Sequence, residues 1–250
     1  MDKALPASAW TLASLAGFTL FWAVIAAALA SPVLPGPEAV FQAFLHEVRI
    51  GNYWYSMGVT LLRVIAAFTI AMAIGSAIGI ALGRSAWAER AFGGWLSLFL
   101  NLPALVTIIL CYVWFGLTEV AAITAVAVNK IPNVAVTMRE GARMLSRDLG
   151  EMAGVYRLSW GESMRHVILP QLAPYFAVSA RNGLALVWKI VLVVELLGRS
   201  NGVGFQLHTN FQLFDVAAIL AYAIGFILIV QFIELGILGP WEAYTKRWRR

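Results

Sequence analysis

Six apolar runs, separated by short charged segments, set the limits on what this chain can fold into. A helix needs roughly 20 residues to cross about 30 Å of hydrocarbon at about 1.5 Å per residue. The chain of 250 residues is 61% hydrophobic and only 12% charged, whereas a soluble domain has about 45–50% apolar and about 25% charged residues. We therefore predict an all-α membrane protein with about six transmembrane helices. The predicted spans are residues 11–30, 60–82, 95–117, 120–137, 173–197 and 217–238.

Two of the runs have features that complicate this interpretation. The fourth is short and contains Asn129, Lys130, Pro132 and Asn133, so it must face protein or a wet cavity and not lipid. In the first run, residues 28–30 have the small-residue pattern of a signal-peptidase site. Its apolar stretch is longer than that of a signal peptide, so we expect the span to be retained. Cleavage after residue 30 would leave five spans.

The basic residues predict how the chain is oriented. The net charge is +5, from 18 basic and 13 acidic residues, but the basic residues cluster between the apolar runs and form no surface stripe, so nucleic acid is not an expected partner. Cytoplasmic loops of membrane proteins carry an excess of Lys and Arg. Both termini are therefore predicted to be cytoplasmic. The residues assigned to that side are Lys3, Arg84, Arg90, Arg139, Arg143, Arg147, Arg157, Arg165, Lys246, Arg247, Arg249 and Arg250.

The chain divides into three predicted units, and membrane lipid is expected to surround its spans. Residues 1–55 hold the first span and a periplasmic amphipathic helix, in which Val40, Phe44 and Val48 recur at helical spacing. Residues 56–240 form the main transmembrane domain, and residues 241–250 form a basic cytoplasmic tail. In the second span Gly75, Gly79 and Gly83 lie four apart on one face, which predicts close packing of a neighbouring helix.

The most informative polar segment is the cytoplasmic loop at residues 146–170. Met152, Val155, Tyr156 and Leu158 give a short helix there an apolar surface. Apolar side chains at helical spacing on a charged loop predict a docking site for another protein.

The loop resembles the membrane-spanning subunits, or permeases, of binding-protein-dependent ABC importers. Their signature is Glu-Ala-Ala, three residues, Gly, nine residues, Ile, one residue and Leu-Pro. The chain departs from it at Met152 and at Arg157, where the family has Gly. The matching residues are Glu151, Ala153, Val167, Leu169 and Pro170. Further landmarks resemble the branch of nitrate, sulfonate and taurine importers: Leu102-Pro103, Trp114-Phe115-Gly116, Ile131-Pro132-Asn133, Glu195-Leu196-Leu197 and Asn201-Gly202-Val203-Gly204.

The resemblance implies a type I ABC importer permease fold in a bacterial inner membrane. Two copies would form a pathway for a small anionic solute such as nitrate, a sulfonate or taurine, delivered by a periplasmic binding protein. Two ATPase subunits would hold ATP and Mg, since the chain has no Gly-Lys dipeptide and hence no phosphate-binding loop. The permease would be a transport subunit and not an enzyme. The implied ATPase-coupling residues are Glu151, Met152, Ala153, Gly154, Arg157, Leu158, Gly161, Leu169 and Pro170.

Ionisable residues inside the spans are candidates for the substrate pathway, because each costs about 2.5–3.5 kcal/mol on insertion scales and needs water or a partner. A positive lining would attract an anionic solute. Alternatively, the lysines pair with Glu195 or Glu234, or extend toward the headgroups. The pathway candidates are the ionisable Lys130, Arg181, Lys189 and Glu195, together with the uncharged Asn133.

Other function classes fit the sequence less well. No two histidines have metal-ligand spacing, and we expect no cofactor bound by this chain. A secondary transporter or channel acting without an ATPase is the alternative, since broken helices and intramembrane charges also occur there. The loop pattern disfavours it, as does the absence of recognisable inverted repeats. An intramembrane enzyme would need a catalytic constellation that the sequence lacks.

Overall fold

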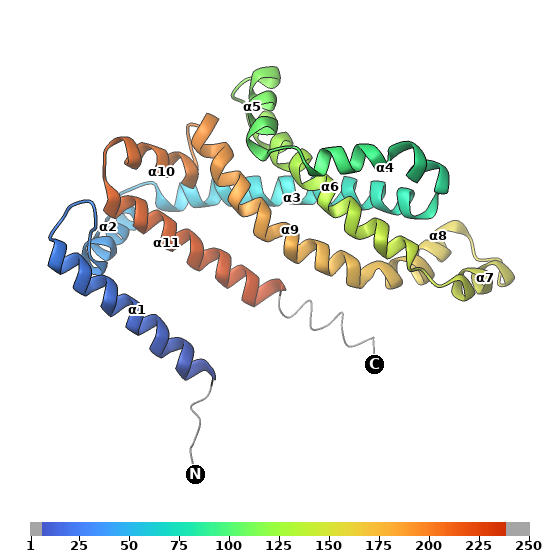
Figure 1. Cartoon of the computed structure of the whole chain (residues 1–250), viewed down its shortest axis with the longest axis horizontal. Helices are drawn as coiled ribbons and strands as arrows, with labels where there is room; N and C mark the ends of the chain where they lie inside the picture. Colours follow the sequence, from blue (N-terminus) through green and yellow to red (C-terminus); the bar gives the residue numbers. More distant parts are fainter. Residues whose placement is uncertain (1–6, 239–250) are drawn as a thin grey trace, which may run out of the picture.

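The computed structural model describes residues 7–238, and side chains from Trp10 to Gly236. All regular secondary structure in this part of the chain is helical, without a strand (Figure 1). The first half contains α1 (Ala7–Leu29), α2 (Pro37–Arg49), α3 (Tyr53–Arg84), α4 (Ala86–Leu100), α5 (Ala104–Phe115) and α6 (Glu119–Arg143). The second half contains α7 (Arg147–Val155), α8 (Trp160–Ser163), the π-helical turn η1 (Met164–Ile168), α9 (Leu169–Gly198), α10 (Val203–Gln212), α11 (Val216–Ile233) and a second π-helical turn, η2 (Glu234–Leu238).

Five helices are long and apolar enough to cross a membrane, and a bent pair makes a sixth crossing when it is taken as one span. The predicted single helix at 95–117 is wrong. It is replaced by α4 and α5, which meet at 98°, because the chain leaves helical geometry at 101–103 and Pro103 cannot donate a backbone hydrogen bond. The fourth span is also longer than predicted, since α6 has 25 residues and accommodates Pro132.

The α3 glycines bring the backbones of α3 and α6 together. A Cβ atom at Gly75 would lie 2.6 Å from Val134 Cβ, and one at Gly83 would lie 2.6 Å from Ala142 Cβ. Separations this short leave no room for a side chain. The predicted close packing is confirmed, and α3 and α6 form the centre of the bundle.

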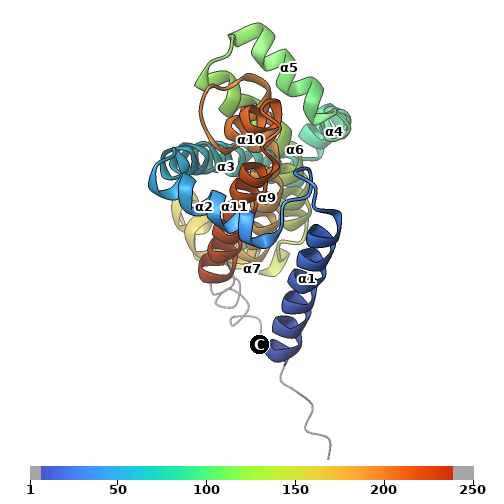
Figure 2. The same cartoon turned by 90° about the vertical axis from the view of Figure 1, so that its left-hand side faces the viewer.

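The long helices run between two distinct ends. In Figure 1 α2 and α10 lie at one end, and α7 and α8 lie at the other. The predicted amphipathic helix is observed as α2, which packs against α11 and α3. Seen from the α2 end, α1 stands apart from the bundle and α5 projects from the opposite side (Figure 2). The basic tail and residues 1–6 lie outside the described residues.

Candidate functional site

The segment after α6 reverses direction through α7, whose start is capped and tied to α9. The Ser146 hydroxyl accepts a hydrogen bond from the Leu149 N–H at 3.4 Å, which is the usual role of serine at a helix N-terminus. The Ser146 N–H donates to Gln171 Oε1 at 2.9 Å. Because Gln171 belongs to α9, the first turn of α7 is fixed to the helix that crosses the membrane next.

The end of α7 explains why the chain can carry Arg157 where the resemblance implies glycine. Arg157 has φ +52°, and its N–H donates to the Gly154 carbonyl at 3.0 Å while the Leu158 N–H donates to the Ala153 carbonyl at 3.0 Å. This pair of bonds is a Schellman motif, whose left-handed residue is usually glycine. Arg157 thus adopts a conformation in which glycine is usual, at the steric cost of a side chain in the left-handed region.

The apolar residues of α7 divide between an anchored and an exposed side. Ala153 is buried, and α7 packs against η1. Val155, which is 80% exposed, forms an apolar tip with Tyr156 and Trp160. Of the other implied coupling residues, Leu158 is half-buried, and those that face solvent are Glu151, Met152, Gly154, Arg157, Gly161, Leu169 and Pro170.

The Leu169-Pro170 pair marks the point where a wider turn becomes the regular helix α9. A capping box opens α8, with the Ser159 N–H donating to Glu162 Oε2 at 2.8 Å. The Leu169 N–H then closes the π turn on the Met164 carbonyl. Pro170 has no N–H, so its position at the start of α9 leaves no donor unpaired. The loop is therefore continuous with a membrane-crossing helix.

A cluster of four charged residues lies at the opposite end of the bundle. Arg63 Nε and Nη2 donate to the two carboxylate oxygens of Glu119 at 2.8 and 2.6 Å, and Nη1 donates to Glu195 Oε1 at 2.7 Å. Arg199 donates to Glu119 and to the Leu117 carbonyl. We call Arg63, Glu119, Glu195 and Arg199 the outer cluster; its formal charges sum to zero.

Polar groups complete the coordination of Glu195, which has no exposed surface. Its carboxylate accepts the Gly204 N–H at 2.8 Å, and both of its oxygens lie 2.9 Å from Thr60 Oγ1. The Thr60 hydroxyl accepts the Val203 N–H at 2.9 Å. The backbone at Gly202 can lie this close to Glu195 because the residue is glycine: its φ is +103°, and a Cβ there would collide with the Glu195 carboxylate.

The outer cluster differs from what the sequence suggested. Glu195 was a candidate for the substrate pathway, but the structure encloses it among protein groups. The sequence does not identify Arg63 and Glu119 as a pair, nor Arg199 as a member of the same cluster. One signal could have found Arg63, because an arginine within an apolar span requires a partner.

The remaining intramembrane candidates do not all lie at one point. Lys130 is buried between α6 and α9 with 3% of its surface exposed. Lys189 is exposed and lines a cavity of about 360 Å³ together with Glu234. Arg181 Nε lies 3.9 Å from Glu234 Oε1. Asn133 is half-buried, and its Nδ2 donates to the Asn129 carbonyl at 3.4 Å.

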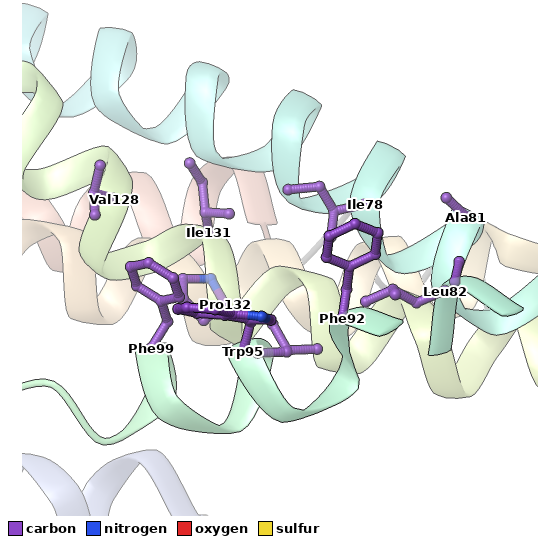
Figure 3. A pocket seen from close by; sticks show the side chains of 11 residues that line it. Ile78, Ala81, Leu82, Phe92, Trp95, Phe99, Val128, Ile131 and Pro132 are labelled. Carbon is purple, nitrogen blue, oxygen red and sulfur yellow. The ribbon is translucent and has the colours of Figure 1, made fainter. Parts of the chain in front are cut away.

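A second cavity, of about 490 Å³, is formed by α3, α4 and α6. Trp95 and Phe99 of α4 lie by Pro132 of α6, and Phe92 of α4 points toward Ile78 of α3 (Figure 3). Every lining residue is apolar. This cavity offers no side-chain hydrogen bond or charge to a polar solute, apart from the indole N–H of the tryptophan.

Comparison with known proteins places the chain among transport proteins. Residues 71–238 match the family described as binding-protein-dependent transport system inner membrane component. The putative aliphatic sulfonates transport permease protein SsuC of Escherichia coli (strain K12) is 32% identical over 219 residues, covering 86% of this chain and 80% of that protein. The taurine transport system permease protein TauC of the same strain is 26% identical, covering 98% and 93%.

More distant similarities extend this comparison. The bicarbonate transport system permease protein CmpB of Synechococcus elongatus (strain ATCC 33912 / PCC 7942 / FACHB-805) is 25% identical, covering 95% of this chain and 87% of that protein. Among solved structures, an amino acid ABC transporter gives a TM-score of 0.65 at 19% identity, covering 80% of this chain and 98% of the other. The MetNI methionine ABC transporter gives 0.62 at 17% identity, covering 73% and 92%.

Proposed function

The chain belongs to the family of binding-protein-dependent transport system inner membrane components, and from this premise we propose that two copies form the pathway of an ATP-driven importer for a small anionic solute. Its fold is that of the type I ABC importer permeases. The named solutes of its relatives are aliphatic sulfonates, taurine and bicarbonate, each of which carries an anionic oxygen group. This shared chemistry supports the proposed solute class.

The exposed apolar tip of α7 is the observation that carries the proposal. Val155 and Tyr156 are exposed residues at the end of α7, and α7 lies at one end of the bundle. The segments at that end are rich in arginine. The positive-inside rule assigns that end, with both termini, to the cytoplasm. An ATPase subunit would dock on α7 of each copy and hydrolyse Mg-ATP there, while a periplasmic binding protein would deliver the solute at the α2 and α10 end.

The connections of α7 provide a route for mechanical coupling. Ser146 links the start of α7 to Gln171 of α9, and α7 packs on η1, which continues into α9. A displacement of α7 by the ATPase would therefore move the cytoplasmic half of α9. Rigid-body movement of packed helices is a common way to switch the side from which a site is accessible.

The test is to reconstitute the permease with the ATPase and binding protein of its own transport system. Val155→Asp introduces a charge at the docking tip without disturbing a buried residue, so we expect loss of ATPase co-purification and at least a tenfold fall in uptake. Leu213→Asp is the matched control, since Leu213 is an exposed leucine at the other end. It should retain the ATPase. Wild-type co-purification and uptake by Val155→Asp would refute docking at α7.

A further inference from the structure

Lys130 lies in the seam between α6 and α9 without a counter-ion. Within residues 7–238 its ammonium makes no hydrogen bond or ion pair, although only 3% of the residue is exposed. A Cβ atom on Gly183 would lie 2.8 Å from Lys130 Cε, so α9 provides space for this side chain and not a charge. Ionisable groups inside a membrane ordinarily have a partner or water. The missing partner of Lys130 is therefore expected to come from outside the described chain.

Two carboxamides flank Lys130 on α6. At 100° per residue, Asn129 and Asn133 lie about 100° and about 60° from Lys130 around the helix. Val134 and Met138 lie on the other side of Lys130, where they meet the α3 glycines. Both asparagines are half-buried. They therefore border the side of the α6–α9 seam that α3 leaves open.

A third carboxamide approaches the same side from α9. Asn182 precedes Gly183 and is exposed. Around the axis of α9 it lies about 100° from Gly183 in one direction, and Glu195 lies in the other direction. Glu195 bonds to α3. Since α6 runs toward the α7 end and α9 runs away from it, Asn182 lies on the same side of the seam as the α6 asparagines. The helical rise places all three within about 5 Å of the level of Lys130.

We propose that Lys130, Asn129, Asn133 and Asn182 form an oxyanion-binding site halfway across the membrane, which selects monovalent solutes with a sulfonate or carboxylate group. This inference rests on the proposed function, because it requires the open side of the seam to face the pathway between two copies. The ammonium supplies one positive charge, and the carboxamides supply uncharged N–H donors, one of which, on Asn133, is already donated to the Asn129 carbonyl. A single charge supplemented by neutral donors suits a transport site, from which the solute must also leave.

Thiol modification in native membranes tests the charge of the site without ATP. The chain has one cysteine, the buried Cys111, so Cys111→Ser provides a background for Asn182→Cys. The anionic reagent 2-sulfonatoethyl methanethiosulfonate resembles a small sulfonate, and its trimethylammonium counterpart has the opposite charge. We expect the anionic reagent to react at least tenfold faster. Equal rates, or no reaction with either reagent, would overturn the proposal.

Variants of the two lysines assign that preference to Lys130. Lys130→Met should reduce the rate ratio to about one, and Lys130→Arg should preserve it. Lys189→Met removes the same charge from the same membrane region and should leave most of the preference intact. A preference lost in Lys189→Met but kept in Lys130→Met would place the anion site elsewhere. Gly183→Ala displaces the flexible end of Lys130 without removing its charge, so a severalfold lower ratio is expected even if Lys130→Met fails to insert.

Protection by solutes tests the proposed class. Methanesulfonate and bicarbonate should each slow modification of Asn182→Cys, whereas the neutral dimethyl sulfone should not. Equal protection by all three would show that the site does not recognise an oxyanion. The proposed function is tested by a separate result: it fails if Val155→Asp keeps its ATPase and its uptake. The modification rates do not depend on ATP, so they test the anion site alone.

Discussion

Each end of the bundle holds one network of four charged residues whose formal charges sum to zero, but the two networks differ in burial. At the α7 end, Arg139 and Arg143 bridge Glu89 and Glu140 at 2.9–3.3 Å. We call these four residues the inner network. All of them are partly exposed, and they connect only α4 and α6.

The outer cluster is more enclosed and joins more of the chain. The Arg63 and Glu195 side chains are 4% and 0% exposed, and the cluster connects α3, α6, α9 and the segment leading into α10. An exposed ion pair contributes about 0–1 kcal/mol, whereas removing one partner of a buried pair costs about 3–5 kcal/mol. The difference indicates that the outer cluster contributes more to holding the helices together than the inner network does.

The largest expected effect comes from opening the outer cluster. Arg63→Met would leave Glu195 buried without its counter-ion, and we expect the free energy of unfolding to fall by about 3–5 kcal/mol. Denaturant unfolding of the detergent-solubilised protein measures it. Arg63→Met combined with Glu195→Met should recover part of the loss, because no buried charge remains. A loss below about 1 kcal/mol for the single variant would show that the cluster is solvated.

A smaller effect, of opposite sign, is expected at the end of α7. Arg157→Gly removes a side chain from a left-handed conformation that costs about 1–2 kcal/mol for non-glycine residues, offset by the greater freedom of glycine in the unfolded chain. We expect the turn to be stabilised by about 1 kcal/mol. Amide hydrogen exchange at Leu158 should slow by about fivefold. Unchanged or faster exchange would mean that the arginine side chain compensates for the strain.

The smallest effect is expected in the inner network. Glu89→Gln removes one charge from a partly exposed pair, so the free energy of unfolding should change by no more than about 1 kcal/mol. High salt should reduce the difference further. Parallel unfolding curves of Glu89→Gln and Arg63→Met compare the two ends directly. If Glu89→Gln lowers the free energy of unfolding as much as Arg63→Met does, the proposed contrast between the inner network and the outer cluster is wrong.

Apolar runs predicted most of the fold, since length and hydropathy determine which segments can cross a membrane. They failed at 95–117, because hydropathy records whether a segment prefers lipid and not the direction in which it runs. Pro103 marked the break, but Pro132 lies inside a continuous helix. Only the surrounding packing distinguishes these two prolines.

The sites were predictable to different extents. The α7 segment is local, so its helix and apolar tip could be inferred from neighbouring residues. The outer cluster joins Arg63 to Glu195, 132 positions away, and one sequence does not specify which distant charges pair. The sequence indicates Lys130 and Asn133 by their chemistry alone. Asn182 was missed because its relevance depends on Gly183 lying opposite Lys130.

The close contact between α3 and α6 has a consequence for genetics. A side chain at Gly79 would meet the carbonyl of Ala135 and come within 3.0 Å of the Arg139 nitrogen. These are backbone atoms, present whichever amino acid α6 carries at those positions. A compensating substitution on α6 cannot make room, so a defect caused by a larger residue at position 79 is corrected by reversion at that codon and not by a second-site change in the facing helix.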